Sequence, residues 1–275
     1  MKKLLALLLV VLLTGCSTQQ PSYSNLVDKE SQTLAAQAMT EAGISEAAVK
    51  AFLTNVNDYN MTVENTSLIK QGFVDKMPQY DELAFAEKWE DKKQLYIGNN
   101  CRMTSYGLMN DLVTISDKTT NTANLFMDKD AISYAPTAWL DEDTARFTTL
   151  FGFVPTPNTK DVEVHVAKLQ QAWQERGIHF NEQAKASLIS VVMHSTLDDQ
   201  LFIGHAGVLV PQANGYLFIE KLSFQEPYQA VQLANKEQLN AYLMEKYDVS
   251  ENQPEAKPFI MENGELLTTY KALRT

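Results

Sequence analysis

The segment LFIGHAGVLVPQANGYLFIEKL, Leu201–Leu222, decides the fold of this chain. Asn214-Gly215 is the strongest short hairpin signal, and the runs that flank it are rich in β-branched, aromatic and leucine residues. The pattern therefore predicts two antiparallel strands, Leu201–Val210 and Tyr216–Leu222, joined by a tight turn.

Within the first strand, one histidine lies in an unusual setting. His205 stands between Gly204 and Gly207, and a glycine inside a strand often marks a bulge or a close approach by a ligand or another backbone. Pairing the strands about the turn places Glu220 beyond Gly207, near His205. Whether the two side chains share a face depends on the register, which is left open here.

The rest of the chain supplies helices before the hairpin and mixed elements around it. Helices are predicted at 29–42, 45–57, 81–89, 161–176 and 235–247, with a strand at 188–194 and a second hairpin at 258–270. Residues 60–80 and 116–160 are expected to be largely irregular. Helices followed by an antiparallel sheet predict the α+β class.

A further helix begins at Cys101. Apolar and small residues recur from there at spacings of four, three, four and three, which is one face of a helix. These residues are Cys101, Ser105, Leu108, Leu112 and Ile115. Asn99 or Asn100 is a suitable cap, which places the sulfur at a helix N-terminus, where the dipole favours a thiolate. We expect this thiol to be accessible and to have a lowered pKa.

The N-terminus has the three parts of a signal peptide. Lys2-Lys3 is followed by the apolar run Leu4–Leu13 and by Leu13-Thr14-Gly15-Cys16. Ten apolar residues are too few to span a bilayer, which needs about 20. The segment resembles bacterial lipoprotein signals, which implies that Cys16 is lipidated and that the domain is held on the extracytoplasmic face of the cell membrane.

These patterns give a domain plan. Residues 1–15 are expected to be the signal peptide and 16–28 a tether, followed by a single α+β domain over 29–275. Within that domain, a helical lobe is expected at 29–90 and the core at 91–275. The net charge of −11 becomes more negative once two lysines leave with the signal, which argues against nucleic acid, anionic lipid surfaces or wall polyanions as main ligands.

With Cys16 lipidated, Cys101 has no cysteine partner, and the simplest chemical reason for an unpaired exported thiol is that it is a nucleophile. Such catalysis needs an imidazole and a third polar group that orients it. Of the four histidines, His205 is the candidate, and Glu220 is the weaker candidate for the third group. The other three, His165, His179 and His194, have the settings of ordinary surface or edge residues.

Residues beside the thiol are candidates for binding substrate. The backbone N–H of Cys101, with Asn100 or Gln94, is a candidate oxyanion donor. Arg102 could hold the thiolate, receive a substrate carboxylate or pair with an acid, and these remain open.

Other motifs give no cofactor or metal site. The sequence has no P-loop, dinucleotide-binding glycines, nucleophile elbow or zinc-ligand spacing. Asp128–Asp130 and Asp141–Asp143 lack the EF-hand continuation, so solvated acidic turns are expected there.

The chain resembles the papain-like hydrolases of the NlpC type. In that group a helix-capping Cys precedes a strand beginning His-Val-Gly-Ile and a polar residue on the next strand, and Cys101, His205 and Glu220 match these positions in order. The resemblance implies a papain-like helix packed on an antiparallel sheet. The Asp-Cys-Ser of that group is replaced by Asn100-Cys101-Arg102.

That segment and Glu220–Phe224 resemble a group of Gram-positive lipoproteins, the domain-of-unknown-function 4300 family, which has no assigned activity.

Three functions are therefore weighed. The first is a membrane-anchored cysteine hydrolase acting on amide bonds of cell-wall (peptidoglycan) peptides. The second is a binding lipoprotein that uses the same cleft without chemistry, and the third is a structural envelope protein. In the last two, Cys101 is a small buried hydrophobe and His205 a hydrogen-bonded strand residue.

Overall fold

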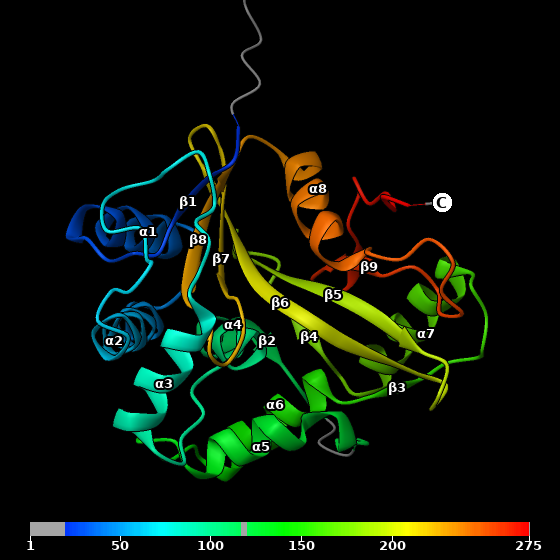
Figure 1. Ribbon diagram of the computed structural model, residues 1–275. Helices are drawn as coiled ribbons and strands as arrows, with labels where there is room; N and C mark the ends of the chain where they lie inside the picture. Colours follow the sequence, from blue (N-terminus) through cyan, green and yellow to red (C-terminus); the bar gives the residue numbers. More distant parts are fainter. Residues whose placement is uncertain (1–19, 117–119, 275) are drawn as a thin grey trace, which may run out of the picture.

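The structure is a computed structural model that describes residues 20–116 and 120–274 (Figure 1). The predicted signal peptide and Cys16 lie outside the described residues. Over those ranges the fold is mixed α and β, as expected for the α+β class, and is built on an antiparallel sheet with the order β1-β8-β7-β6-β5-β9-β10, in which β3 also pairs with β6.

The strands of this sheet are β1 (Ser22–Ser24), β3 (Val154–Pro155), β5 (Ser187–Ser195), β6 (Gln200–Gln212), β7 (Gly215–Lys221), β8 (Tyr228–Leu233), β9 (Phe259–Glu262) and β10 (Glu265–Leu266). A separate pair is formed by β2 (Val113–Thr114) and β4 (His179–Phe180).

The helices are α1 (Lys29–Glu41), α2 (Glu46–Thr62), α3 (Glu82–Lys93), α4 (Cys101–Met109), α5 (Phe126–Ser133), α6 (Asp141–Phe151), α7 (Val162–Glu175) and α8 (Lys236–Tyr247). Short polar side chains cap several of them: Asp28, Ser45 and Asp81 each accept a hydrogen bond from a backbone N–H in the first turn of α1, α2 and α3. Asn235 caps α8 in the same way, since its side chain accepts a hydrogen bond from the Gln238 N–H.

Helices cover both faces of the central strands. Ala206 and Val208 of β6 pack in a large hydrophobic cluster with α1, α2, α4 and α7. Leu209 of β6 and Phe218 of β7 point the other way, into a second cluster with Leu239 and other apolar residues of α8. Figure 1 shows the same arrangement, with α8 on one side of β6 and β7 and α4 on the other. The alternation of side chains along a strand therefore gives the central strands two buried faces.

The hairpin that the sequence predicts is present. β6 and β7 pair from Gly207 opposite Glu220 to Gln212 opposite Gly215. A register shift in the β5–β6 pairing leaves Gly204 as an extra residue between Ile203 and His205, so this glycine marks a bulge. At Gly207, a Cβ would lie 2.2 Å from the Phe218 ring, so this glycine allows a close approach by an aromatic side chain.

Three expectations are corrected. The tether was expected to reach residue 28, but Ser22–Ser24 pairs with β8 and Leu26 is buried, because this segment supplies the edge strand of the sheet. Residues 29–90 form no separate lobe, since one hydrophobic cluster runs from Leu26 to Met261. The stretch 116–160, expected to be largely irregular, contains two short helices: α5, which ends before Pro136, and α6, which lies between Pro136 and Pro155.

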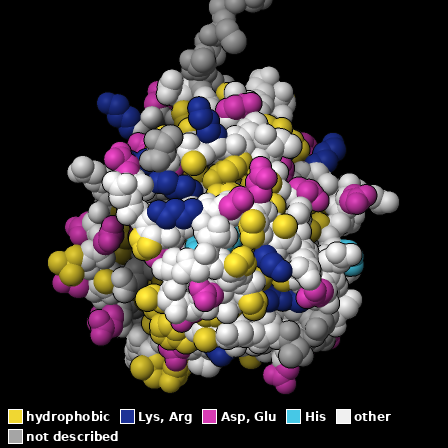
Figure 2. All heavy atoms as spheres, turned by 90° about the vertical axis from the view of Figure 1, so that its right-hand side faces the viewer, with side chains coloured by type: hydrophobic (Ala, Val, Ile, Leu, Met, Phe, Trp, Pro, Cys, Tyr) yellow, Lys and Arg dark blue, Asp and Glu magenta, His cyan; other side chains and the backbone are white. Residues whose placement is uncertain are grey.

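Two surface properties bear on function. Among the described residues, no helix is long and apolar enough to cross a membrane. On the face shown in Figure 2, basic side chains occur in small groups between acidic and hydrophobic ones. That face therefore offers no broad positive surface of the kind that attracts nucleic acid.

Candidate active site

The site lies where β6 has no strand beside it on one edge. β3 pairs with β6 at Gln200 and Leu201, and β7 begins to pair only at Gly207. Between these points the backbone groups of β6 need other partners. The N-terminus of α4 lies against this stretch: Arg102 Nη1 donates to the Ile203 carbonyl at 3.0 Å, and the Ala206 N–H is one of the groups that lower the pKa of the Cys101 thiol.

α4 begins as the sequence predicts. Asn100 has extended backbone angles and its Oδ1 accepts a hydrogen bond from the Met103 N–H at 2.9 Å, which is the N-cap arrangement. Cys101 is therefore the first residue of the helix. Its thiol lies at the positive end of the helix dipole, and its own N–H belongs to the first turn, which has no acceptor within the helix.

The histidine and the glutamate also meet. His205 Nε2 and Glu220 Oε2 are 2.6 Å apart, and both side chains are essentially fully buried. The register places Glu220 opposite Gly207, so the two side chains share the face of the sheet that α8 covers. Nε2 is occupied by Glu220, which leaves Nδ1 as the ring nitrogen available to the thiol.

The thiol and imidazole form a coupled pair. The charge of His205 and a hydrogen bond from its ring, followed by Arg102 and the Ala206 N–H, lower the pKa of the Cys101 thiol although burial opposes this. Conversely, burial would lower the pKa of His205, but the Cys101 thiolate and then Glu220 raise it from 6.5 to about 9. These directions favour a thiolate–imidazolium pair, with Glu220 ionised because the same imidazolium lowers its pKa.

The Cys101 sulfur is more deeply buried than the sequence predicts. The thiol was expected to be accessible, but Cys101 is free and only 6% exposed, because α4 packs closely against β6. Its surroundings are nevertheless not those of a small buried hydrophobe. The groups that act on it are an imidazole, a guanidinium and a backbone N–H.

Asn100 and Arg102 are tied to a buried acid. Asp128 of α5 accepts from Asn100 Nδ2 at 2.7 Å and from Arg102 Nε and Nη2 at 3.0 and 2.7 Å. Asp128 was expected in a solvated acidic turn, but it is fully buried because it neutralises Arg102. Of the roles left open for Arg102, the structure contains the pairing with an acid, and the guanidinium also lowers the pKa of the neighbouring thiol. Together these bonds join α5, α4 and β6 beside the thiol.

Gln94 lies apart from this cluster. It caps the C-terminus of α3 with a left-handed backbone (φ 54°) and is exposed. Within the described residues no side-chain hydrogen bond joins it to Cys101 or its neighbours. Asn100 also has its amide oxygen on the helix cap and its amide nitrogen on Asp128, so the Cys101 N–H is the oxyanion donor best placed of those considered.

Residues of α8 and β8, which the sequence analysis did not select, complete the far side of the site. Glu220 Oε1 accepts from Tyr242 Oη at 2.5 Å and from Gln229 Nε2 at 3.1 Å. The Tyr247 ring stacks on the His205 ring, with centroids 5.2 Å apart and planes at 25°. No local sequence signal marks these residues, because their role depends on how α8 packs on the sheet.

Next to Glu220, Lys221 is buried on the other face. Its ammonium donates to the carbonyls of Ser223, Phe224 and Glu226 and lies 4.2 Å from the Tyr59 ring centroid. Burial lowers the pKa of this lysine to about 7. The bonds fix the turn after β7, whose Phe224 carbonyl lies against Gly98, shortly before Cys101.

The remaining histidines do not join the site. His179 is exposed as expected, but His165 and His194 are buried and their ring centroids are 4.4 Å apart. His165 is satisfied by Thr156 Oγ1 at 2.6 Å and the Thr159 carbonyl at 2.8 Å, which is why a polar helix position faces inward. Within the described residues, no three His, Cys, Asp or Glu side chains converge as a metal site would require.

A large cavity lies close to the thiol but on a different face of α4. It has a volume of about 890 Å³ and is lined by α2, α3, α4 and the segment before α6. Met103, Tyr106 and Asn110 face it. At 100° per residue, Cys101 projects from the opposite side of the helix, toward β6.

Comparison with known proteins places the chain in a family. The family model "Domain of unknown function (DUF4300)" matches residues 22–267. The chain belongs to this family. No curated protein and no solved structure gives a significant match. The family match covers β1 through β10 and includes Cys101, His205 and Glu220, so these residues belong to the family domain.

Proposed function

We propose that this member of the DUF4300 family is a lipid-anchored extracytoplasmic cysteine hydrolase that cleaves amide bonds of cell-wall peptides. One observation carries the proposal. A cysteine at a helix N-terminus is influenced most strongly by a strand histidine, and Nε2 of that histidine lies 2.6 Å from a buried glutamate on the next strand, which leaves Nδ1 for the thiol. The chain order of the three residues is that of the papain-like NlpC type, which supports the finer assignment of the fold.

The geometry gives each residue a role. The Cys101 thiolate attacks the amide carbonyl carbon, and the Cys101 N–H binds the oxygen that gains negative charge. His205 then gives its Nδ1 proton to the leaving nitrogen as the C–N bond breaks, which leaves a thioester. A water molecule attacks this thioester while His205 takes its proton, and the acid product and the thiolate are released. Glu220 keeps Nε2 protonated and holds the ring in place throughout.

The anchor rests on the Leu-Thr-Gly-Cys box. Lipidation at Cys16 would hold the domain within a few nanometres of the membrane, because few residues separate Cys16 from β1. Acyl chains contribute about 0.8 kcal/mol for each buried CH₂, so two or more give stable anchoring. Cys16→Ser should therefore move the protein out of the membrane fraction. Its persistence there in high salt would contradict the anchor.

The activity is tested by mass spectrometry of cell-wall peptides incubated with the protein. Loss of an amide bond is expected with the wild type and not with Cys101→Ala or His205→Ala. Cys16→Ser is the matched cysteine control, because it removes the other cysteine and leaves the site intact. Wall peptides that stay unchanged at high protein concentration would refute the hydrolase.

One observation favours the second candidate, a binding protein without chemistry. The cavity beside α4 has ample room for a small ligand, whereas the sulfur is almost covered. If this is the function, wall peptides bind with equal affinity to the wild type and to Cys101→Ala and are recovered intact. Gly107→Leu, which fills the cavity from α4, then abolishes binding.

A further inference from the structure

The imidazole of His205 is enclosed by groups that come from the C-terminal part of the chain. Glu220 holds one ring nitrogen, and the flat face of the ring is covered by Tyr247. Tyr247 is the last residue of α8, a position where helices fray unless they are held. Its place on the imidazole therefore depends on what fixes the end of α8.

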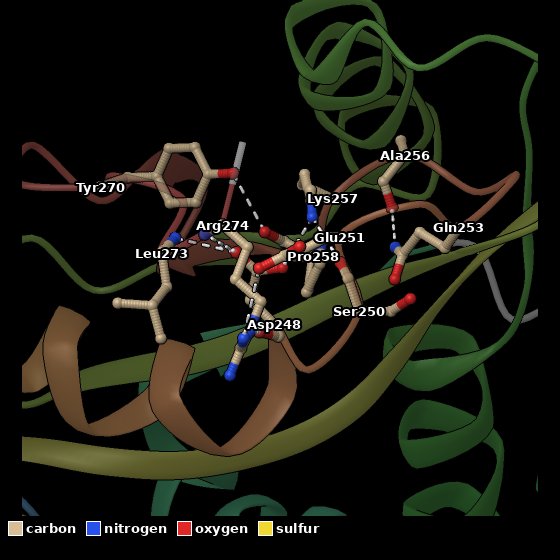
Figure 3. Close-up of polar contacts among 10 residues, drawn as sticks. All are labelled: Asp248, Ser250, Glu251, Gln253, Ala256, Lys257, Pro258, Tyr270, Leu273 and Arg274. Carbon is tan, nitrogen blue, oxygen red and sulfur yellow. Dashed lines mark hydrogen bonds and ion pairs between the residues drawn. The ribbon is translucent and has the colours of Figure 1, made fainter.

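The end of α8 is fixed by a buried carboxylate. Asp248, the C-cap residue, is fully buried, and its Oδ2 accepts hydrogen bonds from the backbone N–H groups of Leu273 and Arg274, both at 2.8 Å. Its Oδ1 pairs with Lys257 Nζ at 3.2 Å. Figure 3 shows these groups converging on Asp248 from the C-terminal segment and from the loop that follows α8.

Further bonds hold the same segment. Arg274 Nε donates to the Asp248 carbonyl at 2.7 Å, which satisfies one of the last carbonyls of the helix region. Earlier in α8, Asn240 exchanges two hydrogen bonds with the backbone of Lys271, at 2.9 and 3.0 Å. Tyr270 Oη donates to the Pro258 carbonyl at 3.0 Å, also drawn in Figure 3. The segment Tyr270–Arg274, named here the C-terminal clasp, thus binds α8 at two points one helical turn or more apart.

We propose that Tyr247 is a positioning residue for His205, and that the C-terminal clasp, through Asp248, holds its ring on the imidazole. The role rests on the proposed function and extends it to residues far from the thiol. A stacked ring blocks rotation of the imidazole about its bond to Cβ, so that Nδ1 stays toward Cys101 and Nε2 toward Glu220. It also excludes water from that face, and the electron-rich aromatic face suits an imidazolium.

The contributions of the hydroxyl group and of the aromatic ring of Tyr247 can be tested separately. Within the described residues the Tyr247 hydroxyl has no hydrogen bond to the site, whereas the ring contact is direct. Tyr247→Phe should therefore keep the function, and Tyr247→Leu, which is still apolar, should lose it. The truncation that ends the chain at Tyr270 removes Leu273 and Arg274, the partners of Asp248 Oδ2, and should act in the same direction as Tyr247→Leu. Leu169→Ala, a buried change in α7, serves as a control for a general loss of stability.

The test applies ¹⁵N-histidine NMR and alkylation kinetics to the full-length wild type, to its three point variants and to the truncation. Exchange of the His205 Nε2 proton with water should speed up at least tenfold in Tyr247→Leu and in the truncation, and stay within twofold of wild type in Tyr247→Phe and Leu169→Ala. Alkylation of Cys101 by iodoacetamide at pH 6 should slow at least fivefold in the same two variants. Unchanged proton exchange in a folded Tyr247→Leu protein would overturn the proposal.

The two proposals can fail separately. If the wild type does not cleave wall peptides, the hydrolase is refuted, but the exchange rate of the imidazole proton still reports whether Tyr247 shields the ring. If the wild type is active and Tyr247→Leu matches it in both proton exchange and alkylation, only the positioning role is refuted. A truncated chain that behaves as wild type while Tyr247→Leu does not would overturn the part assigned to the clasp.

Discussion

Replacing Cys101 with serine should lower the pKa of His205, because the thiolate is the largest influence that raises it. The difference between 6.5 and about 9 corresponds to about 3 kcal/mol in favour of the imidazolium. Burial acts in the opposite direction, so the attractions of Cys101 and Glu220 together exceed this value. Cys101 is the first of these two influences, so its loss should bring the pKa of His205 down toward the ordinary value of 6.5.

Serine is the right substitution because it keeps a small hydroxyl beside the ring but stays neutral. The assay is an NMR titration of ¹⁵N-histidine protein, in which only four histidines give signals. By linkage, a neutral His205→Gln should raise the pKa of the thiol by a similar free energy, read from the thiolate absorbance. A His205 pKa that stays within half a unit of wild type in Cys101→Ser would refute the ion pair.

The pair also gives stability a defined pH dependence. A raised pKa for His205 stabilises the folded protein fully below pH 6.5, and this contribution is lost as the pH rises through about 9. The lowered pKa of Cys101 acts in the opposite sense, since its contribution is present above the thiol pKa of the unfolded chain and is lost as the pH falls. In Cys101→Ser the contribution of His205 should therefore be smaller, and its loss, which begins near pH 6.5 in both proteins, should be complete at a lower pH.

Three further predictions test the surroundings of the site. Asp128→Asn should destabilise the protein by about 3 kcal/mol in urea unfolding, because it leaves Arg102 buried without its partner. The control Asp130→Asn, on the exposed side of α5, should leave the free energy of unfolding almost unchanged. Gly207→Ala should destabilise the fold through the clash with the Phe218 ring, while Gly107→Ala, which meets no atom within 4 Å in α4, should stabilise it by about 0.5–1 kcal/mol. Iodoacetamide should alkylate Cys101 near pH 6 in the native wild type. Alkylation should be about tenfold slower in Glu220→Gln, since a neutral amide stabilises the imidazolium less than a carboxylate does. Labelling only after denaturation would contradict a reactive thiol.

Local rules could predict the parts of this fold that depend on neighbours in sequence. The Asn-Gly hairpin, the bulge at Gly204 and the cap at Asn100 each follow from the preferences of a few adjacent residues. The register of the hairpin then sets Glu220 opposite Gly207, so that the histidine and the glutamate share a face. Their contact is a consequence of strand geometry once the turn type is known.

Residues that act through long-range packing could not be found in the same way. Tyr242 and Tyr247 lie on α8, and the sequence pattern of a helix indicates only which of its sides is apolar. Their contacts with Glu220 and His205 depend on where α8 packs on the sheet. β1 and β8 were missed for a similar reason. Ser22–Ser24 is too short and polar to give a strand signal, and it is a strand only because β8 offers it an edge.

The residues flanking the thiol show how adjacency in sequence can mislead about function. Arg102 follows Cys101, and binding a substrate carboxylate was one of the three roles that the sequence left open, but its side chain bonds to Asp128 and to the Ile203 carbonyl. The guanidinium therefore fixes the start of α4 against β6, and its positive charge lowers the pKa of the Cys101 thiol. Substitution of Arg102 should accordingly lower kcat and slow alkylation of Cys101, with little effect on KM, and a selective rise in KM would contradict this assignment.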